Sequence, residues 1–352
     1  MIMKKNRDSS FDAFRGLAII AVVAIHVVGS AFLWRYPSTD RWNFFFLITY
    51  CQLINFAVPA FLFISGYWSA KEPMESLADY KTFLTKRLPR ILIPYLFWSL
   101  VWLGCEVSKT HDFNAGEIIL KLFLGRACSG YYFIVVIVQF YIITPLLQRL
   151  NRRPAGIVFV LILSIIGLLA LYLSRLFNVI MYLPASTLFY SWIIFYEVGL
   201  LAGNRDNKKM FMSGNVRFII LPAILVFLLI SAMESMFLLS RYGGSYFTIS
   251  PTKYSSVLYL VCVFCGFLFV REHIKNWPKF LVTLGKYSFG IYLIHIPVFR
   301  MIASIAQKSY IYSFQPLYQF TVVFFTVLIC FVLIIFTRKL LPKSFCRRVL
   351  GF

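Results

Sequence analysis

The chain has 352 residues, of which 60% are hydrophobic and only 14% are charged. A soluble domain of this length carries more polar surface, so the composition excludes a soluble globular protein and predicts an all-α integral membrane protein. We expect one membrane domain over residues 1–352 with no appended soluble domain. The formal net charge is +22, but Lys and Arg lie in short runs between apolar stretches, which is typical of membrane topology and argues against nucleic-acid binding.

Ten apolar stretches are long enough to cross a bilayer as helices, since about 20 residues span its hydrocarbon core. In chain order they cover 12–34, 43–68, 89–107, 131–149, 155–174, 187–203, 217–239, 254–270, 281–304 and 316–337. The first resembles a secretory signal, but its length and the presence of Arg15 and His26 indicate a retained helix. Residues 116–126 are amphipathic and too short to span, so we expect them on the membrane surface.

The connecting segments alternate in basic charge. If the N-terminus is inside, every cytoplasmic segment is basic and together they hold most of the Lys and Arg, beginning with Lys4, Lys5 and Arg7. The positive-inside rule therefore predicts about ten transmembrane helices with both termini in the cytoplasm. The chain shows no internal repeat and no interrupted hydrophobic segment, which argues against an inverted-repeat transporter.

Arg15 and His26 are the most informative pair in the first expected helix. Eleven residues bring the helix about 20° past three full turns and about 16 Å along its axis, so both side chains share one face, with Arg15 near the cytoplasm and His26 at mid-membrane. Asp12 lies three residues before Arg15 and can pair with it. A neutral imidazole at that depth can accept a proton from a hydroxyl, and arginine can bind a phosphate. Snorkelling of Arg15 and a helix–helix hydrogen bond of His26 are the structural alternatives.

Three further stretches carry polar residues at membrane positions. In "KRLPRILIPY", Arg87 and Arg90 precede the third expected helix and can clamp phosphates, although ordinary positive-inside charge also explains them. In "FLFISGY", Ser65, Gly66 and Tyr67 permit close approach of a ligand or of another helix. In "LGKYSFGIYLIHIPVFR", His295 adds a second intramembrane histidine, which is either a site group or a helix–helix partner.

These motifs together resemble the membrane-bound acyltransferase family 3, whose members O-acylate bacterial surface glycans. The resemblance rests on Arg15-x10-His26 followed by "FLFISGY", "RLPRILIPY", "YYFIVVIVQFYIITPLL" and "LGKYSFGIYLIH", and it runs from about residue 10 to about residue 335. It implies a multi-pass protein of the bacterial cytoplasmic (inner) membrane that transfers an acyl group, commonly acetyl, from cytoplasmic acyl-CoA to a glycan or lipid-linked sugar.

The resemblance also implies roles for individual residues. His26 is expected to be catalytic, with Arg15 and Asp12 as its partners on the same helix. Acyl-CoA, a co-substrate rather than a bound cofactor, is expected at Arg87 and Arg90 and at the Ser65–Gly66–Tyr67 element. Many relatives carry tryptophan where the fourth helix begins, whereas this chain has Tyr131 and Tyr132; we expect these two and His295 to contact the sugar. No metal site is expected, and a partner in polysaccharide synthesis or export is compatible with the family.

Two other interpretations remain open from the sequence. In an exporter or small-solute transporter, Arg15, His26, Glu197, Glu234 and His295 would line a path for substrate or protons. Pairing of Glu197 with Arg205 or with another helix is the structural alternative for that residue. In a scaffold of a polysaccharide-synthesis complex, replacing His26 would have no effect. The Arg-x-x-Arg element favours the enzyme, because a sugar permease has no use for a clamp on CoA phosphates.

Overall fold

The computed structural model describes residues 8–32, 41–72, 74–177, 187–204, 216–242 and 246–352, and all regular structure in these ranges is helical. Parts of the expected basic segments, including Lys4, Lys5, Arg7, Arg205, Lys208 and Lys209, lie outside the described residues. Nine of the described helices or helix pairs are long and apolar enough to cross a membrane. The expected all-α membrane architecture is therefore confirmed.

The helices follow the expected order along the chain. The first half contains α1 (Ser9–Phe32), α2 (Arg41–Ile54), α3 (Ala57–Ser69), α4 (Leu77–Thr110), α5 (Ala115–Phe123), α6 (Tyr132–Leu150) and α7 (Pro154–Leu176). The second half contains α8 (Ile193–Gly203), α9 (Val216–Tyr242), α10 (Tyr254–His273), α11 (Lys279–Lys286), α12 (Ser288–Ala306), α13 (Gln315–Leu340) and α14 (Lys343–Phe345). Single 3-10 turns lie at Phe189–Ser191, Tyr246–Ile249 and Tyr310–Ser313, and a π-helical turn at Cys346–Leu350 follows α14.

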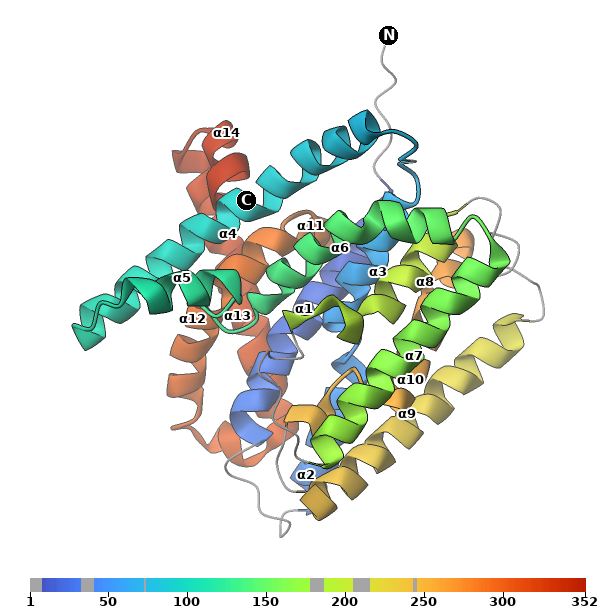
Figure 1. Cartoon of the computed structure of the whole chain (residues 1–352). Coiled ribbons are helices and arrows are strands. Elements are labelled where there is room, and N and C mark those ends of the chain that lie inside the picture. Colours follow the sequence, from blue (N-terminus) through green and yellow to red (C-terminus); the bar gives the residue numbers. More distant parts are fainter. Residues whose placement is uncertain (1–7, 33–40, 73, 178–186, 205–215, 243–245) are drawn as a thin grey trace.

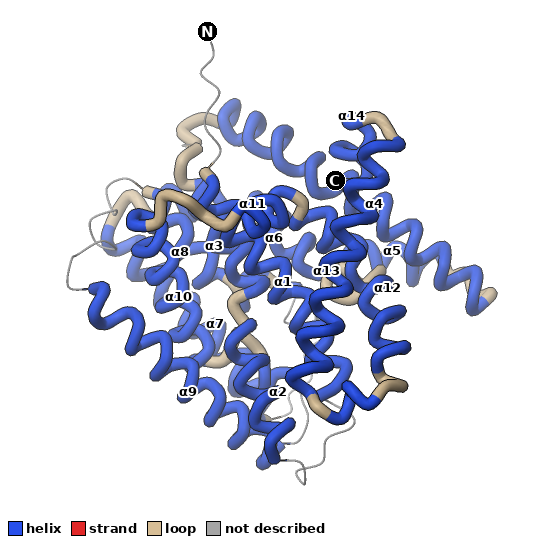
Figure 2. Tube along the Cα trace, turned by 180° about the vertical axis from the view of Figure 1, so that it is seen from behind, coloured by secondary structure: helices blue, strands red, loops and turns tan. Residues whose placement is uncertain are grey.

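Helix α1 lies at the centre of the bundle (Figure 1), where α2, α3, α11, α12 and α13 contact it. Helices α7, α9 and α10 form one flank, whereas α4 crosses the other flank obliquely and projects from it together with α5. The first turn of α1 and the C-terminal α14 lie at the same end of the bundle (Figure 2). Residues on α1 are thus surrounded by protein along most of the helix.

The second expected span is interrupted. Helix α2 ends at Ile54 and α3 begins at Ala57, with Asn55 in the break. The side-chain amide nitrogen of Asn55, Nδ2, donates to the carbonyl oxygen of Ile249 at 3.0 Å and to Gln52 Oε1 at 2.9 Å. These side-chain bonds tie the break to the chain at Ile249 and to the last turn of α2. The expectation of uninterrupted hydrophobic segments was therefore wrong, since the apolar residues on both sides hide the break.

The third expected span begins earlier than the hydrophobic pattern indicates. The Ser76 hydroxyl accepts from the backbone N–H of Asp79, and the Asp79 carboxylate accepts from the backbone N–H of Ser76, so a capping box starts α4 at Leu77. Arg87 and Arg90 consequently lie within α4 rather than before it. The prediction of their position was wrong because polar residues occupy the first turns of this helix.

The sixth expected span, 187–203, is not one helix. The regular structure in this span is a 3-10 turn followed by α8. With 11 residues, α8 rises about 16 Å, roughly half the thickness of the hydrocarbon core. The ninth expected span is also divided, because α11 ends at Lys286 and α12 begins at Ser288. Hydrophobic length alone missed both interruptions, because the few polar residues, such as Lys286 at the second break, do not lower the average hydropathy of either span enough to reveal them.

Two helix crossings bring backbones into direct contact through glycine. At the crossing of α1 and α11, a Cβ on Gly285 would lie 1.7 Å from the carbonyl oxygen of Asp12, and a Cβ on Gly16 would lie 2.2 Å from that of Leu281. At the crossing of α3 and α8, a Cβ on Gly199 would lie 2.1 Å from the carbonyl oxygen of Phe63. No other residue type fits at these positions without separating the helices.

Helix α4 is fixed to the bundle near Trp98. The Trp98 indole N–H donates to the carbonyl oxygen of Leu350 at 3.1 Å, and its ring lies 6.1 Å from that of Phe352. The segment after α13 thus packs between α4 and α12. Beyond Trp102, most α4 side chains are exposed.

Candidate functional site

Two histidines from distant parts of the chain meet inside the bundle. The rings of His26 on α1 and His295 on α12 have centroids 5.1 Å apart. His295 is fully buried, whereas His26 is half-buried and keeps some accessible surface. The pair therefore combines an enclosed imidazole with an accessible one, and both were expected site residues.

The hydrogen bond of His295 defines its tautomer. Its Nδ1 lies 2.7 Å from the carbonyl oxygen of Tyr292. A carbonyl only accepts, so Nδ1 carries the proton and donates, and in the neutral ring Nε2 keeps a lone pair. Among the described residues, Nε2 of His295 has no hydrogen-bond partner although it is buried. An unsatisfied acceptor at such depth is costly unless a further proton or group meets it.

A hydrogen-bonded scaffold supports the histidine pair. The Tyr292 hydroxyl donates to the carbonyl oxygen of Gly130 at 2.6 Å, and the Tyr131 hydroxyl donates to that of Leu293 at 2.6 Å while accepting from the Trp102 indole at 2.8 Å. These bonds tie α12 to the start of α6 and to α4. The hydroxyl of Tyr131 is thus already engaged in the core, so the structure places this residue behind the site.

Gly130 closes the space beside His26. Its φ is +90°, and a Cβ there would lie 3.3 Å from Nε2 of His26. The backbone therefore approaches the imidazole closely at Nε2. Tyr132, the other expected sugar contact, is half-buried and its ring stacks on Trp192 at 6.1 Å.

Asp12 and Arg15 form the expected ion pair at the start of α1. Arg15 Nη1 lies 3.2 Å from Asp12 Oδ1, and the side chain of Asp12 is 1% exposed whereas that of Arg15 is 28% exposed. Asp12 thus orients an arginine that still reaches the surface. The helix rise places this pair about 16 Å from His26, so Arg15 does not touch the imidazole.

The two arginines of the Arg-x-x-Arg element have different surroundings. Arg87 donates to Glu72 Oε1 at 2.9 Å, and its guanidinium lies 4.6 Å from the ring centre of Phe83. Arg90 is exposed. The structure therefore gives Arg87 a positioning role for the loop before α4 and leaves Arg90 available to an anion.

The Ser65–Gly66–Tyr67 element lies at the contact of α3 with α8. A Cβ on Gly66 would lie 2.2 Å from the carbonyl oxygen of Tyr196, so a helix occupies the space that the sequence left to a helix or a ligand. The Ser65 hydroxyl donates to that of Tyr141 at 3.2 Å. The Tyr67 hydroxyl accepts from Lys71 at 3.0 Å and lies close to the first turn of α1.

We expect Gly66→Ala to lower the thermal stability of the protein. Its Cβ would collide with the backbone of α8, and such overpacking costs about 1–3 kcal/mol. Gly29→Ala is the matched control, because its Cβ meets nothing within 4 Å among the described residues and alanine favours a helix. Thermal unfolding in detergent measures both. Unchanged stability together with a raised KM for acyl-CoA would instead show that Gly66 contacts the donor.

Arg271 is a residue that sequence reasoning missed. It donates to the Tyr67 hydroxyl and to Asp8 Oδ2, each at 2.9 Å, and its guanidinium lies 4.9 Å from the ring centre of Phe11. It thereby joins the ends of α3 and α10 to the start of α1. No signal in the sequence indicates this, because its partners lie more than 200 positions away.

A second polar cluster also lies inside the bundle. Lys253 is fully buried and donates to the Ser235 hydroxyl at 2.6 Å and to the carbonyl oxygen of Ser231 at 3.0 Å, with Glu234 Oε2 at 3.8 Å. The Ser231 hydroxyl continues to Gln52 Oε1 at 2.7 Å. This network links α9 and α10 to the break after α2, which gives Glu234 a structural role.

Glu197 was expected as a transporter candidate or as a partner of Arg205. It is fully buried on α8, next to the side chain of Asn151. Arg205 lies outside the described residues, so that pairing stays a prediction.

Comparison with known proteins gives a family match and several relatives. Residues 8–335 match a family model described as an acyltransferase domain. A "Probable poly-beta-1,6-N-acetyl-D-glucosamine export protein" of Staphylococcus aureus (strain MSSA476) is 26% identical over 69% of this chain and 69% of its own length. A "Putative membrane-bound acyltransferase YfiQ" of Bacillus subtilis (strain 168) is 24% identical over 80% and 78%. No solved structure matches the chain.

Proposed function

Because the chain belongs to the acyltransferase family whose domain covers residues 8–335, we propose that it moves an acyl group, most simply acetyl, from cytoplasmic acyl-CoA to a glycan hydroxyl. The acceptor is a cell-surface glycan or a lipid-linked sugar, and the protein acts in the bacterial inner membrane. The observation that carries this proposal is the pair of His26 and His295. A half-buried imidazole inside the bundle supplies a base where the acyl group and the acceptor can meet.

In the proposed reaction, a nitrogen of His26 takes the proton of the acceptor hydroxyl while the hydroxyl oxygen attacks the thioester carbonyl. The carbon–sulfur bond then breaks, and the CoA thiolate leaves and receives that proton. His295 lies beside His26 with its Nδ1 fixed on Tyr292, so its Nε2 lone pair can share the proton held by the pair. His295 thereby acts as a positioning residue for His26.

The charged end of acyl-CoA would stay at the cytoplasmic end of α1. Arg90 is exposed on α4, and Asp12 holds Arg15 toward the surface at the start of α1. Guanidinium groups bind phosphate through charge-assisted hydrogen bonds. The pantetheine arm would then run along α1 to His26, over the axial rise of about 16 Å that separates Arg15 from His26.

We expect Arg90→Ala to raise the apparent KM for acetyl-CoA about 10-fold or more, since a hydrogen bond to a charged group is worth about 1.5–3 kcal/mol. Because this contact would be equally strong before and during the chemical step, kcat should stay near the wild-type value. Steady-state kinetics with acetyl-CoA measure both constants. Arg152→Ala is the control, because Arg152 is an exposed basic residue near Glu75. A fall in kcat alone would contradict the phosphate role of Arg90.

The direct test of the function uses purified protein in liposomes with labelled acetyl-CoA and an N-acetylglucosamine acceptor. Mass spectrometry should detect one acetyl group on the sugar. In cells, loss of the protein should remove the same group from surface glycans. Unmodified glycans in both preparations would refute the proposal.

Export is a second candidate function, favoured by the break between α2 and α3 and by the half-length helix α8. Discontinuous helices line substrate sites in many transporters, and the Staphylococcus relatives carry an export name. Proteoliposomes loaded with a fluorescent N-acetylglucosamine oligomer separate the two functions. Release of unmodified oligomer without acyl-CoA would support export, whereas modification that depends on acyl-CoA supports acyl transfer.

A further inference from the structure

Arg300 is a positive charge in the apolar part of α12, and the proposed reaction gives it no task. It lies between Phe299 and Met301 in a candidate membrane span, Ser288–Ala306, and it is exposed. Within the described ranges it forms no hydrogen bond and no ion pair. A charge at membrane depth is costly unless an opposite charge, water or a headgroup meets it. Arg300 therefore needs a partner from outside the described chain.

The electrostatic neighbours of Arg300 belong to the histidine site. Its charge acts on His26 and on Cys128. Cys128 precedes Gly130 by two residues, and a Cβ on Gly130 would lie 3.3 Å from Nε2 of His26. Both neighbours thus lie around the same imidazole, one on α1 and one on the segment that covers it. An arginine directed only at lipid headgroups would not share these neighbours.

Arg300 lies on the side of the two histidines that faces away from Arg15. The close crossing of α1 and α11 places the start of α12 beside the start of α1. His295 lies beside His26, and Arg300, five residues later, lies about 7.5 Å further along the axis of α12. Because the proposed donor reaches His26 from the Arg15 end, Arg300 lies where the acceptor must enter.

The charge of Arg300 restricts which acceptor suits the site. His26 becomes positively charged when it takes the proton of the acceptor hydroxyl. With a neutral acceptor, two positive charges would then lie close together, and like charges repel most strongly where water is scarce. A carboxylate or a phosphate on the acceptor would pair with the guanidinium through charge-assisted hydrogen bonds and offset this repulsion.

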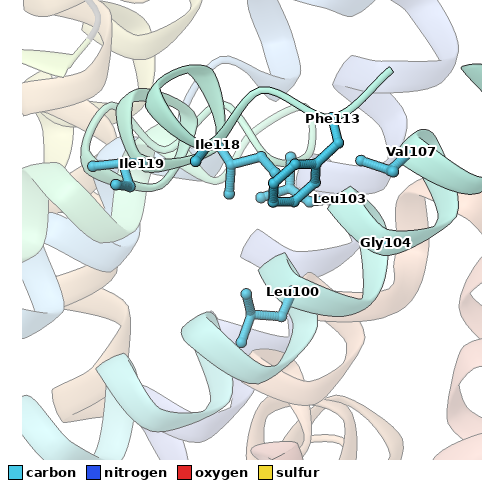
Figure 3. Close-up of a pocket in the computed structure, with 8 residues that line it drawn as sticks. Leu100, Leu103, Gly104, Val107, Phe113, Ile118 and Ile119 are labelled. Atoms are coloured by element: carbon cyan, nitrogen blue, oxygen red, sulfur yellow. The ribbon is translucent and has the colours of Figure 1, made fainter. Parts of the chain in front are cut away.

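The groove between α4 and α5 does not provide a second site for such an anion (Figure 3). Its volume is about 350 Å³, and its lining is apolar, with Leu100, Leu103 and Phe113 among the side chains. A negatively charged group would lose water there without gaining a hydrogen-bond donor. The anion of the acceptor therefore belongs at Arg300.

We propose that Arg300 binds an anionic group, a carboxylate or a phosphate, on the acceptor sugar and so directs a hydroxyl of that sugar toward His26. The inference rests on the proposed acyl transfer and specifies the charge of its acceptor. Arg300 thereby makes the protein selective for acidic glycans over neutral ones. Headgroups of anionic lipids carry the same phosphate chemistry and are the alternative partner.

Three derivatives of N-acetylglucosamine that differ only at the anomeric position test the proposal: the methyl glycoside, the carboxymethyl glycoside and the 1-phosphate. With purified protein in neutral detergent and acetyl-CoA, kcat/KM should be about tenfold or more higher for one or both anionic derivatives than for the methyl glycoside. The preferred derivative identifies the anion. In Arg300→Gln the ratio should fall to about one, and Arg300→Lys should restore part of it, because the charge remains while the planar fork is lost.

Lys308→Gln is the matched control, because Lys308 is an exposed cation just beyond the end of α12. It should keep the wild-type ratio. An equal fall in kcat/KM for all three derivatives in Arg300→Gln, or an unchanged ratio, would overturn the proposal. Loss of the preference when phosphatidylglycerol is added to the micelles would also overturn it and would assign Arg300 to lipid headgroups.

Binding without turnover distinguishes this proposal from the proposed reaction. Without acetyl-CoA, isothermal titration should show tighter binding of the preferred anionic derivative than of the methyl glycoside in the wild type and in His26→Ala, but not in Arg300→Gln. If this difference is present while no derivative is acetylated, acyl transfer is refuted and the anion site is kept. If Arg300→Gln slows transfer from succinyl-CoA but not from acetyl-CoA, Arg300 serves the donor and the proposal is overturned.

Discussion

Replacement of His26 by alanine is expected to reduce acyl transfer about 10²–10⁴-fold, the usual contribution of a positioned general base. No other imidazole among the described residues is both inside the bundle and partly accessible, because His295 is enclosed. The loss should appear in kcat, since the base acts during bond formation and not in donor binding. Labelled acetyl-CoA and an N-acetylglucosamine acceptor in proteoliposomes measure the rate.

His273→Ala is the matched control for this experiment. His273 lies at the exposed end of α10, where its Nδ1 contacts the carbonyl oxygen of Phe269 at 2.8 Å. It should retain wild-type activity, and both variants should elute from a sizing column like the wild type. A folded His26→Ala protein with full activity would refute the general-base role and would leave the scaffold or exporter interpretations.

Replacement of His295 should have the second-largest effect, a fall in kcat of about 10²-fold with a nearly unchanged KM for acetyl-CoA. The reason is that His26 would lose the neighbouring ring that positions it and shares its proton. Steady-state kinetics of His295→Ala measure this loss.

Two conservative variants separate this role from simple packing. In His295→Asn the amide can still donate to the carbonyl oxygen of Tyr292, as Nδ1 does now, but no acceptor remains at the place of Nε2. If the Nε2 lone pair matters, His295→Asn stays slow and His295→Gln recovers part of kcat. Full recovery by His295→Asn would show that His295 only supports the backbone of α12.

The long apolar helices could be predicted from the sequence because hydrophobic length and basic loops are local properties. Helix α4 shows the limit, since a capping box at Ser76 extends it through polar turns that the apolar window does not include. The break at Asn55 shows a second limit, because the carbonyl that satisfies its amide belongs to Ile249. A local pattern contains no information about such a distant partner.

The candidate site was predictable in its members but not in its arrangement. His26 and His295 stand out because ionisable residues in apolar helices are costly, yet their contact at 5.1 Å depends on how α12 packs on α1. Gly66 could be predicted only as a site of close approach, and the structure shows α8 there. The burial of Lys253 could not be predicted from the sequence, because its hydrogen-bond partners come from another helix.

The glycine crossings have a mechanical consequence for access to the histidines. Backbone contacts this close prevent the two helices of each pair from sliding on one another. The pair α1 and α11 should therefore move as one rigid unit, and so should the pair α3 and α8. The outer arm of α4 beyond Trp102 has no such close backbone contact, because its Gly104 meets nothing within 4 Å among the described residues and most of its side chains are exposed. A motion that admits substrates should therefore be a rotation of this arm together with α5. A cross-link that joins only α4 to α5 should leave that motion unhindered.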